Sequence, residues 1–168
     1  MFQSYTIAKN SDRVLRFVGE LIAEQTETLN HAGTAIAIFK LRIYAVEGGG
    51  YVPAISFESL SDRTVSAEAD RVHTAQDVEN FFYVYEPLES LQKVKFCTES
   101  RCAECQQLKR RLTTKFDSVT DEIINTFHAF AASQQSFVGS HEDNELRKKA
   151  IKPPNRLRQI LGLQRNDL

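Results

Sequence analysis

The stretch that decides the fold is residues 35–45, AIAIFKLRIYA, in which every odd-numbered position is apolar. The even-numbered positions include Lys40 and Arg42, so apolar and polar side chains alternate with the period of two that is typical of a half-buried strand. Gly48-Gly49-Gly50 favours a hairpin turn after this strand. Residues 51–60 are then expected to form the return strand, and residues 63–72 a third strand. The sequence therefore predicts an antiparallel meander of about three strands.

Helices are predicted on both sides of this meander. Apolar residues between Ser11 and Asn30 recur at helical spacing, with Ser11 as N-cap and Gly33 as C-cap, which predicts an N-terminal helix. Thr74 is expected to cap a short helix that ends before Pro87.

The longest periodic segment covers residues 100–132, where apolar residues recur every three or four positions. This apolar stripe consists of Leu108, Leu112, Phe116, Val119, Ile123, Phe127 and Phe130. An unbroken helix of this length would span about 50 Å, more than the expected width of a compact domain of this size. The sequence leaves two alternatives, a continuous helix and a hairpin broken near Thr120.

Taken together, these patterns predict one α+β domain over residues 1–138, with an N-terminal helix, an antiparallel meander of about three strands and a helical C-terminal half. Residues 139–168 are expected to form a loop and a short basic helical tail, with docking on the domain left open.

Composition narrows the class of protein without naming a function. The 168 residues are 42% hydrophobic and 26% charged, which excludes a disordered or collagen-like chain. The net charge of −1 selects no partner, although residues 1–92 carry net −6 and residues 93–168 net +5. We expect a cytoplasmic protein, because no membrane span or secretory signal is predicted and three clustered cysteines do not make an extracellular disulfide framework.

The cysteines, Cys97, Cys102 and Cys105, are the one cluster of chemically distinctive residues. Their C-x4-C-x2-C spacing allows a zinc site in which a distant histidine is the fourth ligand. Cys102 and Cys105 also continue the apolar stripe, so core packing is the favoured interpretation and zinc is an alternative.

A redox role is a further alternative for the same cysteines, because a cysteine at a helix N-terminus has a lowered thiol pKa. Residues 94–105, VKFCTESRCAEC, resemble the strand, loop and helix start of glutaredoxins. The resemblance covers about 20 of the 168 residues, and the sheet that this family needs after its first helix is not predicted here. No glutaredoxin activity is carried over to this chain.

No catalytic motif or cofactor-binding motif is found, so a non-enzyme is favoured, while catalysis by residues distant in the sequence is left open. The leading hypothesis is a protein-interaction domain, an adaptor, chaperone-like or regulatory subunit, that binds a protein partner or itself through a C-terminal helical surface. The interaction candidates are Leu108, Leu112, Phe116, Ile123, Phe127, Leu157 and Ile160. The alternative is a zinc-stabilised nucleic-acid-binding module, which would use the cysteines and the basic residues Lys109, Arg110, Arg111, Lys148 and Lys149.

Overall fold

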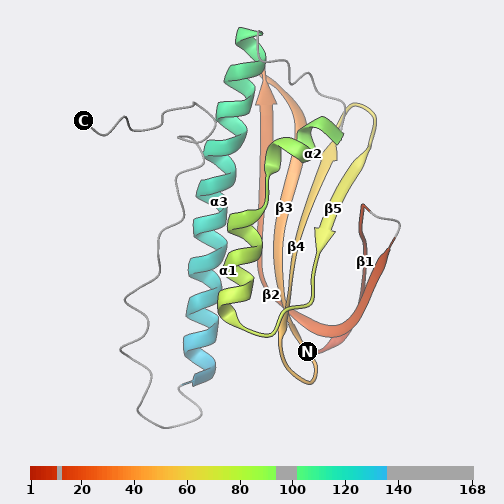
Figure 1. Cartoon of the computed structure of the whole chain (residues 1–168), viewed down its shortest axis with the longest axis vertical. Coiled ribbons are helices and arrows are strands. Elements are labelled where there is room, and N and C mark those ends of the chain that lie inside the picture. Colours follow the sequence, from red (N-terminus) through yellow and green to blue (C-terminus); the bar gives the residue numbers. More distant parts are fainter. Residues whose placement is uncertain (11–12, 94–101, 136–168) are drawn as a thin grey trace, which may run out of the picture.

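The computed structural model describes residues 1–10, 13–93 and 102–135, which form a curled antiparallel sheet covered on one side by helices (Figure 1). The five strands follow one another in the sheet in chain order. They are β1 (Gln3–Ala8), β2 (Val14–His31), β3 (Thr34–Val46), β4 (Tyr51–Ser59) and β5 (Val65–Ala69). The helices are α1 (Ala75–Val84), α2 (Pro87–Lys93) and α3 (Ala103–Gln135).

The predicted N-terminal helix is wrong, because its residues form the long strand β2. A bulge at Ile22 causes the misleading pattern: Leu21 pairs with Tyr44, whereas Ala23 pairs with Ile43. The odd-numbered residues of β2 therefore change faces at the bulge, and apolar residues on two faces together resemble a helical stripe. Pairing with the strongly apolar strand β3 overrides the weak local preference for a helix.

The sheet also has about two more strands than predicted, because β1 precedes β2 as a further partner. Sheet curvature brings the end of this strand to β5: the Asn10 N–H lies 3.0 Å from the Ala67 oxygen, and Ala67 donates to Asn10 Oδ1 at 2.7 Å. Figure 1 shows β1 beside β5, on the side of the sheet away from α3. The curled sheet thus approaches a small barrel.

The predicted meander itself is confirmed as β3, β4 and β5. The triple glycine forms the β3–β4 turn with positive φ at all three positions, 85°, 106° and 84°. Gly50 is further constrained because a Cβ there would lie 2.6 Å from the Val72 oxygen. Gly33, expected to cap a helix, instead lies in the β2–β3 turn at φ 79°.

The two predicted C-terminal helices are confirmed. Thr74 caps α1 through a capping box with Asp77, in which each side chain accepts from the other residue's backbone N–H. The long helix α3 is continuous through Thr120. It runs across β2 and β3: Lys115 bonds to Glu27 of β2, and Phe116 lies close to Phe39 of β3. Its Phe127 lies close to Tyr51 of β4. The thirteen residues of β3 span about 43 Å, so the sheet is long enough to accommodate a helix that exceeds the width expected for a compact domain.

Two apolar clusters occupy the two faces of the sheet. The helix-side core contains Ala37, Phe39, Leu41 and Ile43 of β3 and the part of the α3 stripe from Leu108 to Phe127, whereas Phe130 is half-buried outside it. The opposite face, inside the curl, holds an inner cluster centred on Tyr5, Phe17 and Tyr44, whose rings lie 4.5–5.4 Å apart. A sheet with two apolar faces explains why strict alternation is visible in β3 alone.

Thr120 provides a direct test of the α3 packing. Its side chain is 1% exposed, and its hydroxyl has no hydrogen-bond partner among the described residues. We expect Thr120→Val to raise the free energy of unfolding by about 1 kcal/mol, because the isosteric side chain removes an unsatisfied polar group. Chemical denaturation monitored by circular dichroism measures this change.

Thr113→Val is the matched control, since Thr113 is equally buried but its hydroxyl donates to the Lys109 oxygen at 3.0 Å. Its stability should stay level or fall. Destabilisation by Thr120→Val larger than by Thr113→Val would contradict the packing described here.

Candidate functional site

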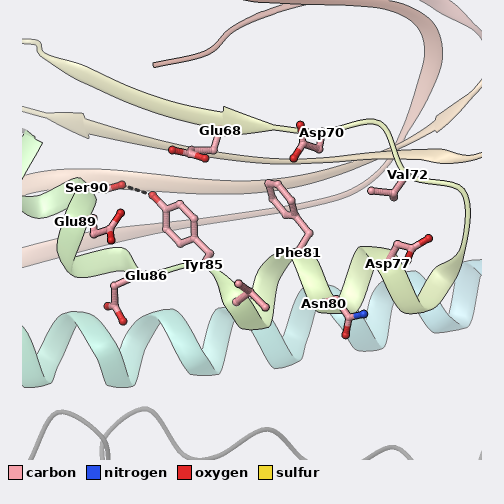
Figure 2. Close-up of a pocket in the computed structure, with 11 residues that line it drawn as sticks. Glu68, Asp70, Val72, Asp77, Asn80, Phe81, Tyr85, Glu86, Glu89 and Ser90 are labelled. Carbon is pink, nitrogen blue, oxygen red and sulfur yellow. Dashed lines mark hydrogen bonds between the residues drawn. The ribbon is translucent and has the colours of Figure 1, made fainter. Parts of the chain in front are cut away.

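A cleft of about 500 Å³ lies between β5 and the helices α1 and α2 (Figure 2). Its walls come from five consecutive parts of the chain: the end of β5, the β5–α1 loop, α1, the α1–α2 connection and α2. The described residues that line it are Glu68, Asp70, Val72, Asp77, Asn80, Phe81, Val84, Tyr85, Glu86, Glu89 and Ser90. They include five carboxylates and no basic side chain.

Local hydrogen bonds hold several of these carboxylates in place. Asp77 accepts from the Thr74 hydroxyl at 2.6 Å and from its backbone N–H, which holds the pKa of Asp77 below its usual value. Glu86 accepts from the Leu88 N–H at 3.2 Å. On the strand side, Asp70 pairs with Lys9 at 2.8 Å, and Glu68 accepts from Asn10 at 3.2 Å. The acidic wall is therefore partly preorganised.

Aromatic side chains supply the apolar part of the cleft. Figure 2 shows Phe81 and Tyr85 pointing from the helices toward β5. Tyr85 stacks on Phe116 of α3, with ring centroids 5.4 Å apart, and its hydroxyl contacts Ser90. Burial raises the pKa of Tyr85 to about 12. Val84, by contrast, is 82% exposed at the cleft margin, so apolar surface remains open to a partner.

Polar contacts with α3 help to position α1 and hence the cleft. Glu79 lies 3.0 Å from His128 of α3, and Tyr83 donates to Asp121 at 3.5 Å. Both contacts use the side of α1 that faces α3. The residues Asp77, Asn80, Phe81 and Val84 of the same helix are consequently left for the cleft.

The structure places the predicted interaction residues of α3 in the core. Leu108 is 4% exposed, and the other four are fully buried beneath the helix against the sheet. Those four residues are Leu112, Phe116, Ile123 and Phe127. The remaining two candidates, Leu157 and Ile160, lie outside the described residues, as do the predicted tail and its docking.

The cysteines and basic residues are separated from this cleft. Cys102 precedes α3 and Cys105 is buried in its first turn, both as free thiols, whereas Cys97 lies outside the described residues. Among the described residues, no group of three His, Cys, Asp or Glu side chains is arranged to hold a metal ion. Arg110 and Arg111 are exposed on α3 and Lys109 is half-buried, while Lys148 and Lys149 lie outside the described part of the chain.

Sequence reasoning missed the cleft because its residues come from segments that were interpreted separately. The available signal was the excess of acidic residues in the first 92 positions. Charge counts show where acidic residues lie along the chain but not which of them are close in space. Glu68 comes close to Glu86 and Glu89 only because α1 and α2 return over β5.

Comparisons with protein-family models, with curated proteins and with solved structures gave no match, so the site is interpreted from its own geometry. Among the described residues, none of the helices has the length and apolar character needed to cross a membrane.

The raised pKa of Tyr85 predicts a specific loss of stability at alkaline pH. The unfolded phenol deprotonates from about pH 10, while the folded one holds its proton to about pH 12, so rising pH favours the unfolded state in this window. The wild-type protein should lose about 0.8 kcal/mol more than Tyr85→Phe between pH 8.5 and 10.5. Urea denaturation at the two pH values measures the difference, and equal losses in the two proteins would contradict the burial of the phenol.

Proposed function

We propose that this chain is a non-enzymatic protein-interaction domain that binds a basic segment of a partner protein in the cleft between β5, α1 and α2. The observation that supports this proposal is the combination, in one cleft, of five carboxylates with the aromatic residues Phe81 and Tyr85. Neither charge nor apolar surface alone distinguishes a site from ordinary protein surface.

Lysine and arginine side chains have the chemistry that matches such a cleft. Each has an apolar stem that packs on aromatic rings and a cationic head that pairs with carboxylates. Arginine also forms bidentate contacts with carboxylates and stacks on aromatic rings. Glu68 and Asp70 on the strand side, with Glu86 and Glu89 on the helix side, would hold a basic segment from two directions.

The proposal keeps the expected class of function but moves the binding surface. The apolar stripe of α3 is used within the chain, since Phe116 and Phe127 are fully buried. We further propose a cytoplasmic location. A reducing compartment would keep Cys102 and Cys105 as the free thiols observed here.

Binding of a basic peptide tests the proposal. A fluorescein-labelled nonapeptide of three Lys-Leu-Arg repeats should bind the full chain with an affinity that falls as salt rises, because charge pairs are screened. Glu86→Gln combined with Glu89→Gln should weaken binding about tenfold, if each charge contributes about 0.7 kcal/mol. Phe81→Ala should weaken binding with less change in the salt dependence. Fluorescence anisotropy measures all three.

The matched control changes the same net charge outside the cleft, by Glu47→Gln combined with Glu122→Gln, both exposed positions. This variant should bind like the wild type. Equal weakening by the two double variants would show a general charge effect and contradict the cleft as the site. Binding of duplex DNA but not of the peptide would favour the nucleic-acid alternative instead.

A further inference from the structure

Two cysteines meet at the start of α3, away from the cleft. Cys102 is the residue immediately before the helix, and its backbone oxygen accepts the Gln106 N–H at 3.0 Å. Its sulfur accepts the Cys105 N–H at 3.4 Å, so a thiol occupies the place that a serine or threonine oxygen usually takes at a helix N-cap. Cys102 is partly exposed, whereas Cys105 is 8% exposed.

This arrangement makes Cys102 the more nucleophilic thiol and leaves Cys105 beside it as the thiol that reacts second. The N-terminus of a 33-residue helix and a direct N–H donor both stabilise negative charge on the Cys102 sulfur, which is the nucleophilic form. The hydrogen bond that the Cys105 backbone N–H donates to the Cys102 sulfur places the two residues within one turn. Residues three apart in a helical turn have Cβ atoms about 5–6 Å apart, which small movements bring to the disulfide range.

We propose that Cys102 and Cys105 form a reversible dithiol–disulfide pair, a redox-modification site oxidised by low-molecular-weight disulfides such as oxidised glutathione. The Cys102 thiolate attacks one sulfur of the small disulfide, forming a mixed disulfide and releasing one small thiolate, which takes up a proton. Cys105 then loses its proton and attacks the Cys102 sulfur, which releases the second small thiol. The protein loses two protons and two electrons, and the small disulfide gains them to become two thiols.

The location of the pair suits a modification that leaves the fold intact. The residues of α3 that enter the helix-side core begin at Leu108, beyond the first turn of the helix, so a bond between residues 102 and 105 leaves the packing from Leu108 to Phe127 in place. The pair also lies at the end of the molecule where Glu104 approaches His31, the last residue of β2, at 4.0 Å. Oxidation there is independent of the cleft and of its proposed peptide.

The experiment uses the full chain with Cys97→Ser, so that the third thiol does not contribute. After reduction and exposure to oxidised glutathione, trypsin releases residues 102–109 as one peptide, because cleavage follows Arg101 and Lys109. Mass spectrometry should find this peptide lighter by two hydrogens, with no glutathione attached, and dithiothreitol should restore its mass.

Two variants in the Cys97→Ser background separate the roles of the thiols. Cys105→Ala should stop at a stable glutathione adduct on Cys102, and Cys102→Ser should leave Cys105 at least about tenfold slower to react. Circular dichroism confirms that each variant is folded. Glutathione adducts without an internal bond in the two-cysteine protein, or Cys105 reacting as fast as Cys102, would overturn the proposal.

Discussion

The packing of the α3 stripe against the helix-side face of β2 and β3 is the constraint on which the rest of the structure depends. Phe39, Leu41 and Ile43 are fully buried beneath Leu112, Phe116 and Ile123. Each such side chain contributes about 1.5–3 kcal/mol when it leaves water. Lys115 of α3 also donates hydrogen bonds to β2, to the Glu27 carboxylate at 2.7 Å and to the Thr28 backbone oxygen at 3.2 Å.

The sheet curls because α3 covers only one of its two apolar faces. One face of β3 is taken by α3, so the apolar side chains of the other face, such as Tyr44 and Val46, need a separate cover. The bulge at Ile22 turns β2 so that Phe17 faces this side, and β1 brings Tyr5 over it. Contact between Asn10 and Ala67 then closes the curl at β5. The cleft forms where α1 and α2 cross back over that same strand.

The sequence predicts the parts of the fold whose patterns are local. Strand β3 shows alternation over eleven residues, the capping residue Thr74 marks α1, and the stripe from Leu108 to Phe127 marks α3. Strand β2 is not predictable in this way, because the bulge at Ile22 moves its apolar residues from one face to the other. Helix continuity at Thr120 depends on the length of β3, which lies far away in the chain.

The two candidate sites also differ in whether their residues are close together in the sequence. Cys102 and Cys105 are close in sequence, where core packing is the favoured interpretation and a redox pair is one alternative. The structure adds the contact of the Cys102 sulfur with the Cys105 backbone and the difference in exposure, which support the proposed thiol pair. The acidic cleft joins residues from β5 to α2 that no sequence motif connects. Residues 68–90 form the candidate cleft only once the helices have packed on the core, so the cleft depends on the packing of the α3 stripe against the sheet.

Amide hydrogen exchange at submicromolar protein concentration tests this packing most directly. If α3 and β3 form one core within a single chain, amides around Leu112–Phe127 and those of Phe39–Ile43 should open with the same free energy, equal to that of global unfolding. Rapid exchange of the α3 amides while the β3 amides stay protected would contradict the account, because the stripe would then be uncovered in the isolated chain.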